Sequence, residues 1–412
     1  MEFRHQQLPN GLEIVAECNP QAYSCAYAFF VRSGSRDEND QVAGVSHFLE
    51  HMVFKGTATR SAADVNRELD ELSSNSNAFT SEEQTVYYAA TLPEDQPNLI
   101  QLMADMLRPA LRQDDFDTEK KVILEEIAKY DDEPPYNAYD RVKEAFFGGH
   151  PLARSVIGST ASVGALTREQ MLEYFERRYS PGNIVLAAAG NVDFDRLVED
   201  AERSCGAWQS FEAARRVDRA QGKRGFTVRT LPQAAQEYVM QMAAAPGTED
   251  DDRYAARVLG VILGDDSGSR LFWELVDTGL ADYASFGAHE YQGTGVFITN
   301  LCCTPEETAA NLQRIATVLA DAQQNGLTPE ELQQAQNKVC AQIVLSAERP
   351  ASRMFTVGNA WLQRRQYRTI REVVEAYRRV TLDDLRAVMR KYPLAASATF
   401  AVGPLTQLSP AE

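Results

Sequence analysis

The sequence HFLEH at residues 47–51 contains two histidines four positions apart and a glutamate next to the second. It lies inside the stretch 42–55, in which apolar residues recur at helical spacing. Gly56 follows this stretch and marks the expected end of the helix. Residues four apart lie one above the other on a helix, so His47 and His51 can face one ion. Glu50 lies on the same side of that helix, within reach of a water molecule on the ion.

Zinc suits these residues, because it accepts two imidazoles and a carboxylate and keeps a fourth position for water. A water molecule on zinc loses a proton near neutral pH, and Glu50 is placed to take that proton. A histidine pair on a helix can also cap the helix or form hydrogen bonds inside a core. A third ligand would therefore separate a catalytic zinc site from a structural pair.

A second amphipathic stretch, expected to be helical over 114–130, offers candidates for that third ligand. Glu119 and Glu126 are seven residues apart and share one face, on or near which apolar residues also lie. Glu125 is turned by about 100° from Glu126 and is typical of a solvated surface acid. A carboxylate on a buried face needs a cation, which favours Glu126 as the zinc ligand. Glu119 is then expected to orient a ligand or the water.

The order of predicted elements repeats along the chain, which indicates an internal duplication. In each half a strand-like run, a helix, a further strand and two helices follow one another; the matching strands are 24–33 with 237–245, and 77–92 with 295–303. Between the halves, 207–224 is polar, basic and unpatterned, as a linker would be. The sequence therefore predicts an α+β fold with two similar domains, 1–206 and 225–412, each an antiparallel-rich sheet packed with helices. Only the first has the histidine pair.

Composition limits the classes of partner and location. The net charge of −18 argues against nucleic acid or an anionic membrane as a partner, because both are polyanions. No signal peptide and no membrane-spanning run is visible. The six cysteines are scattered without a CxxC pair, so we expect a reduced, cytoplasmic protein. The glycine-rich loop 264–268 has two aspartates and no lysine, which makes it a poor phosphate site.

With these motifs the chain resembles the pitrilysin/insulinase family of zinc metallopeptidases, in particular the half-length branch that includes the mitochondrial processing peptidase. The family's signature is the inverted motif HxxEH, found here at 47–51 within GVSHFLEHMVFKGT, residues 44–57. Its third ligand follows another glutamate by seven residues, as Glu126 follows Glu119. The resemblance extends over nearly the whole chain and is most specific between residues 9 and 160.

The resemblance also implies residues that bind substrate. The segment 77–80 is similar to an edge strand that binds the substrate backbone as an added strand; its residues are Asn77, Ala78, Phe79 and Thr80. The family's second half often has an arginine and, seven residues later, a tyrosine that help bind the substrate carbonyl. Tyr283 falls on the tyrosine position, but Val276 stands at the arginine position. Tyr283 is thus a candidate to hydrogen-bond an oxyanion, with a packed strand tyrosine as the alternative.

The function that the resemblance implies is a zinc metalloendopeptidase, with one Zn²⁺ per chain, that hydrolyses extended peptides or unfolded segments. Catalysis would take place in a chamber formed by a homodimer, or by a heterodimer with a homologous subunit. The loss of the arginine favours a different partner chain that supplies it. The alternative is a catalytically silent or partner-dependent structural subunit of a heterodimeric processing peptidase. Such subunits tend to lose motif residues, whereas His47, Glu50, His51 and Glu126 are all present.

Overall fold

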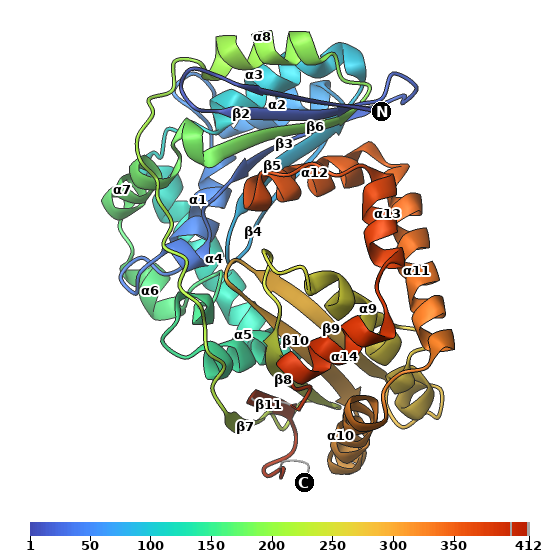
Figure 1. The fold of residues 1–412 in the computed structure, drawn as a ribbon. Coiled ribbons are helices and arrows are strands. Elements are labelled where there is room, and N and C mark those ends of the chain that lie inside the picture. Colours follow the sequence, from blue (N-terminus) through green and yellow to red (C-terminus); the bar gives the residue numbers. More distant parts are fainter. Residues whose placement is uncertain (396–397, 410–412) are drawn as a thin grey trace. The chain divides into compact units, whose positions relative to one another are not determined.

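A computed structural model of the chain describes residues 1–395 and 398–409 (Figure 1). The chain divides into two compact units, each made of three segments. The first unit contains Met1–Ala128, Arg154–Arg216 and Ser346–Tyr367, and the second contains Lys129–Ala153, Val217–Leu345 and Arg368–Glu412. Each unit has its own sheet and its own helices.

The first unit is built on a six-stranded sheet with the order β1-β2-β6-β3-β5-β4. Its strands are β1 Glu2–Gln7, β2 Glu13–Cys18, β3 Cys25–Val31, β4 Asn75–Thr80, β5 Thr85–Thr91 and β6 Ile184–Gly190. Only β2 and β6 pair in parallel, and the other neighbours are antiparallel. The strand β4 lies at the edge and pairs with β5 alone within the described sheet.

Side chains of the central strand β3 alternate between the two faces of this sheet, as the period of a strand requires. Tyr27 and Phe29 face a core shared with helices, and Phe30 faces a second core under one helix, α12 Pro350–Arg364. The helices on the first face are α1 Val45–Val53, α2 Ala62–Glu71, α3 Gln96–Met106, α4 Gln113–Asp132, α6 Thr160–Ala165, α7 Arg168–Arg178 and α8 Phe194–Cys205. Gly358 of α12 allows close packing, because a Cβ there would lie 2.2 Å from the Phe30 ring.

The second unit repeats this plan with five strands in the order β7-β11-β8-β10-β9. The strands are β7 Gly225–Thr230, β8 Glu237–Ala245, β9 Tyr283–Tyr291, β10 Thr294–Cys303 and β11 Ala398–Gly403. Here too one neighbouring pair, β7 with β11, is parallel, in the position that β2 and β6 hold in the first sheet. The duplicated α+β architecture that the sequence predicts is therefore confirmed.

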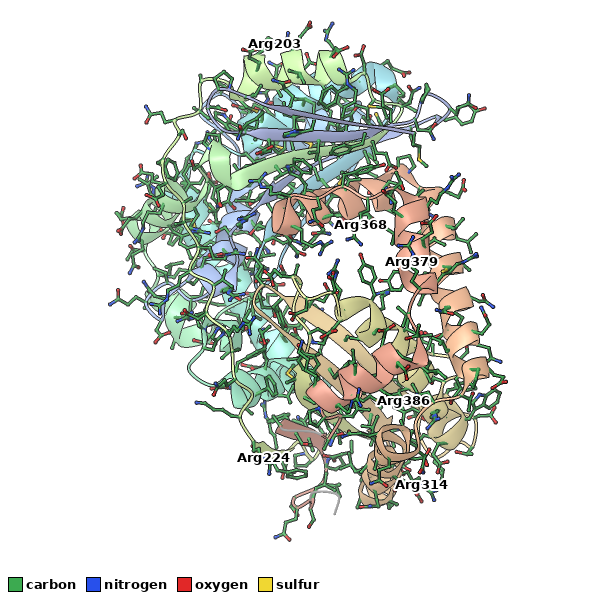
Figure 2. All side chains as sticks on the ribbon, viewed as in Figure 1. Arg203, Arg224, Arg314, Arg368, Arg379 and Arg386 are labelled. Atoms are coloured by element: carbon green, nitrogen blue, oxygen red, sulfur yellow. The ribbon has the colours of Figure 1, made fainter. Side chains whose placement is uncertain are left out.

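Helices cover both faces of the second sheet as well. The helix α5 Pro134–Phe147 packs on one face, and the opposite core includes α9 Arg253–Gly264. The remaining helices are α10 Thr308–Asn325, α11 Pro329–Ala347, α13 Ile370–Arg378 and α14 Leu382–Lys391. Outward faces of the surface helices carry charged side chains, among them Arg203 of α8 and Arg314 of α10 (Figure 2). No described helix is both long and apolar enough to cross a membrane.

One helix of each unit comes from the other half of the sequence. The helix α5 precedes the segment 207–224 but packs on the second sheet, and α12 follows that segment but packs on the first sheet. The domains predicted from sequence are continuous, whereas each of the two compact units also contains a segment from the other half of the chain. The segment 209–224 has no helix or strand, but the side chain of Arg215 within it is only 5% exposed and pairs with Asp37 of the same unit.

The prediction of one strand over 77–92 was wrong, because the structure has a hairpin of two strands there. The strands β4 and β5 flank a turn at 81–84, closed by a bond from Ser81 N–H to the Gln84 carbonyl at 2.8 Å. Threonine, valine and tyrosine favour strands and occur on both sides of the turn, so composition predicted one long strand. The hairpin makes β4 the edge of the sheet, next to α1.

Candidate metal centre

The start of the helix α1, which carries the HFLEH sequence, is fixed by the conformation of Gly44 and by hydrogen bonds from backbone N–H groups. Gly44, at the N-cap, has φ of 93°, and a Cβ there would lie 2.8 Å from the Ile157 carbonyl oxygen. The N–H groups of Gly44 and Ser46 each donate to the buried Glu38 carboxylate at 2.8 Å. A carboxylate at this end of a helix satisfies otherwise unpaired donors and matches the helix dipole. Glu38 therefore holds the first turn that presents His47.

The apolar side of α1 is buried in the core, and this fixes where the opposite side of the helix, with the HFLEH polar residues, points. Phe48, Leu49, Met52 and Val53 are buried in the core under the sheet. The Phe48 ring stacks on Phe116 of α4 with ring centroids 4.7 Å apart, which brings α4 against α1. The residues 47, 50 and 51 are thereby left on the side of α1 that faces α4 and β4.

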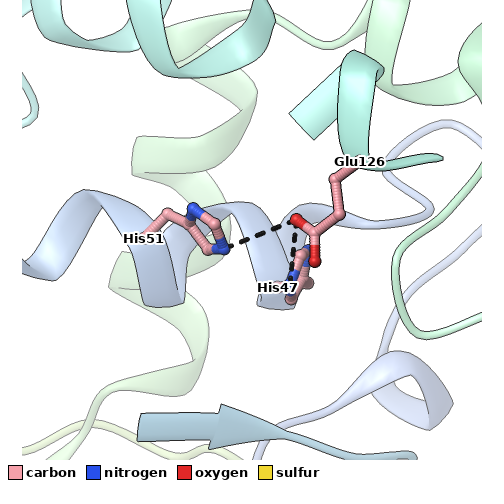
Figure 3. A group of neighbouring side chains, drawn as sticks. All are labelled: His47, His51 and Glu126. Atoms are coloured by element: carbon pink, nitrogen blue, oxygen red, sulfur yellow. Dashed lines mark ion pairs between the residues drawn. The ribbon is translucent and has the colours of Figure 1, made fainter. Parts of the chain in front are cut away.

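Three side chains from α1 and α4 converge, as Figure 3 shows; these residues, His47, His51 and Glu126, are called the metal group. Oε2 of Glu126 lies 3.9 Å from Nε2 of His47 and 3.8 Å from Nε2 of His51. All three ligating atoms lie within 4.8 Å of one another. Tetrahedral zinc with bonds near 2.1 Å needs ligand atoms about 3.4 Å apart, so small side-chain movements suffice. The donor set and its spacing fit zinc.

Glu119 contacts the second histidine from the opposite side of its ring. Its Oε1 lies 2.8 Å from Nδ1 of His51, and its Oε2 pairs with Lys55. Burial raises the pKa of Glu119, but the bonds from His51 and Lys55 outweigh it and hold that pKa below its usual value. An ionised Glu119 accepts the Nδ1 proton, so the lone pair of His51 lies on Nε2, towards Glu126.

His47 is held in its neutral form by a different cause. Its side chain is buried, and burial, with His51 nearby, lowers its pKa to about 3. Neutral imidazole is the form that binds a metal. Its Nδ1 is buried and has no hydrogen-bond partner among the described residues. The two histidines thus differ in what orients them: a carboxylate for His51, and packing for His47.

Glu50 is half-buried next to His51 and is not one of the three converging residues. Its Oε2 accepts a hydrogen bond from Oγ1 of Thr80 at 2.6 Å, and burial raises its pKa. A raised pKa moves a carboxylate towards the range in which it exchanges protons efficiently near neutral pH.

The other predicted site residues lie in two places. In β4, Asn77 and the 36% exposed Phe79 face solvent, while Ala78 and Thr80 are half-buried. This edge strand is within hydrogen-bonding distance of α1 through Thr80. Tyr283 begins β9 in the second unit, and its side chain is 45% exposed. Val276 is part of a π-helical turn, packed against the second unit's core.

Sequence reasoning missed two residues, Lys55 and Glu38, and one contact that shape the site. Lys55 is four positions after His51, a spacing that could have placed it on the same face. Glu38 precedes the first residue of α1, Val45, by seven positions, a signal too weak to read as a cap. The contact of Thr80 with Glu50 joins a strand and a helix 30 positions apart, and no local pattern encodes it.

Known proteins that are similar to this chain include peptidases. Residues 13–160 match the family model described as insulinase (peptidase family M16), and 165–339 match the model described as peptidase M16 inactive domain. An uncharacterized zinc protease of Mycobacterium tuberculosis is 36% identical over 94% of this chain and 90% of its own length. The uncharacterized zinc protease YmxG of Bacillus subtilis is 30% identical over 93% of each chain. A protease from Helicobacter pylori has a similar crystal structure, with a TM-score of 0.92 over 98% of this chain and 99% of that one, at 21% identity.

Proposed function

The chain belongs to the insulinase family of peptidases (family M16), and from this premise we propose that it is a zinc-dependent endopeptidase acting on extended peptides or unfolded segments. The observation that carries the proposal is that the ligating atoms of His47, His51 and Glu126 lie within 4.8 Å of one another. Glu50 lies on α1, the helix of the two histidines. A relative described as a zinc protease, similar over almost the whole chain, supports the choice of metal.

Each residue of the centre has a role in the proposed reaction. His47, His51 and Glu126 would hold the zinc, and Glu119 would keep His51 oriented through Nδ1. When bound, zinc supplies Lewis acidity to a water molecule and to the peptide carbonyl. Glu50 takes a proton from the attacking water and gives it to the leaving amine. The exposed edge of β4 offers backbone groups with which an extended peptide pairs as a further strand.

The proposal includes a homologous partner chain, either a second copy or a related subunit. The family resemblance assigns a carbonyl-binding arginine and tyrosine to the second half, and this chain has Val276 and the exposed Tyr283 there. A partner that brings its own arginine would complete the centre and enclose the substrate in a chamber. The rival proposal, a catalytically silent structural subunit, draws on the same valine and on the match of 165–339 to a model described as inactive.

Cleavage of a quenched fluorescent peptide by the purified chain tests the proposal. We expect hydrolysis that a chelator stops and added zinc restores, and no hydrolysis by Glu50→Gln prepared in the same way. Hydrolysis only after a homologous subunit is added would support the heterodimer. Inactivity under both conditions, with zinc bound at one ion per chain, would favour the structural subunit.

A further inference from the structure

We propose that Thr80 is a positioning residue that fixes the carboxylate of Glu50, and this inference rests on the proposed peptidase function. Its hydroxyl lies 2.6 Å from Oε2 of Glu50 and joins the edge strand β4 to the helix α1. The role differs from the backbone pairing with substrate that family resemblance gives to the segment 77–80. It concerns a side chain and the base, not the peptide.

The hydroxyl proton of Thr80 has two acceptors within reach, Glu50 and Thr85, and Glu50 is the better one. A threonine hydroxyl has a single proton to donate. Oγ1 of Thr85, the nearest alternative at 3.4 Å, gives its own proton to the Ser33 carbonyl at 2.9 Å. The 2.6 Å contact with Glu50 is the shorter of the two and has a charged acceptor, which makes it the stronger bond. Thr80 therefore donates to Glu50.

For the Glu50 side chain this bond is the one hydrogen bond found within residues 1–395 and 398–409. It occupies Oε2 and leaves Oε1 as the oxygen available to a water molecule's proton. A glutamate has three side-chain torsions, and without a partner this half-buried carboxylate would sample several rotamers. Thr80 thus selects the rotamer in which one oxygen is committed and the other is free.

The hairpin that carries Thr80 is itself fixed against the segment that leads into α1. Ser35 N–H and Arg36 N–H donate to the carbonyls of Ser81 and Glu82. A Cβ on Gly34 would lie 2.3 Å from the Ser81 carbonyl oxygen, so the two segments are in close backbone contact. Because the same segment continues to Glu38, which caps α1, Thr80 and Glu50 belong to one rigid frame.

The alternation of β4 separates this role from peptide binding. Asn77 and Phe79 point to the exposed face, and Ala78 and Thr80 point to the half-buried face next to α1. An added strand would pair with the β4 backbone at its open edge. The hydroxyl of Thr80 is directed to Glu50 and is not needed for that pairing.

Thr80→Val and Thr80→Ser provide a matched test. Valine keeps the shape and branching of threonine without the hydroxyl, and serine keeps the hydroxyl. We expect Thr80→Val to lower kcat by about 100-fold, the scale on which misplacement of a reacting group acts, with KM and bound zinc unchanged. Thr80→Ser should stay within about threefold of the parent protein.

A binding measurement in the Glu50→Gln background separates positioning from substrate contact. There peptide cleavage is slow, so affinity for a fluorescent peptide can be measured before it is cleaved, and adding Thr80→Val should leave its Kd unchanged. A weaker Kd would make Thr80 a substrate-binding residue and overturn the inference, as would loss of zinc from Thr80→Val or full activity of that variant. Inactivity of the parent protein, both alone and with a homologous subunit, would overturn the proposed function itself, and the inference with it.

Discussion

Nδ1 of His51 lies 2.8 Å from Oε1 of Glu119, a residue 68 positions further along the chain. The contact fixes both the tautomer and the ring orientation of a proposed ligand, because Nδ1 must carry the proton. Lys55 pairs with the other oxygen of Glu119 and keeps the carboxylate ionised. The three residues form a chain from the end of α1 to the metal group.

Glu119→Ala should weaken zinc binding by about 10- to 100-fold, because His51 loses the acceptor that orients its ring. Competition with a chelator of known affinity measures the effect. Glu125→Ala is the matched control, since Glu125 lies on the same helix but is exposed. Equal zinc affinity in both variants would contradict the orienting role of Glu119.

Glu126→Ala should reduce bound zinc from one ion per chain to a small fraction, because a carboxylate is the third donor of the group. His51→Ala should do the same. Elemental analysis after desalting gives the metal content, and circular dichroism verifies the fold. Unchanged zinc in either variant would contradict that ligand assignment.

Glu50→Gln should retain zinc and lose hydrolysis by about 100- to 10,000-fold, the range in which general acid–base catalysis contributes. The amide has nearly the shape of the carboxylate but cannot take a proton from water. Zinc content and peptide cleavage are measured on the same preparation. An active Glu50→Gln protein would remove Glu50 from the mechanism.

Glu38 should make the protein less stable as pH rises. Burial raises its pKa to about 7, although its bonds from Ser46 and Gly44 act in the opposite direction. A folded-state pKa above the unfolded value near 4.5 means that the folded state binds more protons between these values. The free energy of unfolding therefore falls as pH rises from about 4.5 to about 7, by about 3 kcal/mol from this group.

Glu38→Gln isolates that contribution, because the other titrating groups are the same in both proteins. Urea unfolding at several pH values should show the parent protein losing stability relative to the variant across this window. A constant difference from pH 4.5 to 7.5 would show that the Glu38 pKa is not raised in the folded state.

Arg353→Met should destabilise the protein by about 3 to 5 kcal/mol, because it leaves a buried carboxylate without its cation. Arg353 of α12 and Glu17 of β2 form an ion pair in which both side chains are at most 6% exposed. Urea unfolding measures the loss. Arg379→Ala is the control: its pair with Glu375 on α13 is exposed (Figure 2) and should contribute less than about 1 kcal/mol. Similar losses in the two variants would contradict a larger contribution of the buried Arg353–Glu17 pair to stability.

Much of the fold follows from patterns that span a few residues. Helical spacing predicts α1 and α4, and the repeated order of elements predicts two similar halves, as the matching sheet orders confirm. The hairpin of β4 and β5 was missed because composition does not distinguish one long strand from two short ones around a polar turn. Periodicity identifies the apolar face of an element, but not the element that covers that face.

The sequence by itself determined the donor types of the metal group and their spacing along two helices. Two histidines four apart and two glutamates seven apart must share faces, because the helix has 3.6 residues per turn. Only the tertiary structure decided that Glu126 faces both imidazoles, that Glu119 and Lys55 lie behind His51, and that Thr80 holds Glu50. It also decided that α5 and α12 each cover the sheet of the other half. These contacts join residues from 30 to more than 300 positions apart, and the packing of whole elements, which no local pattern encodes, sets their distances.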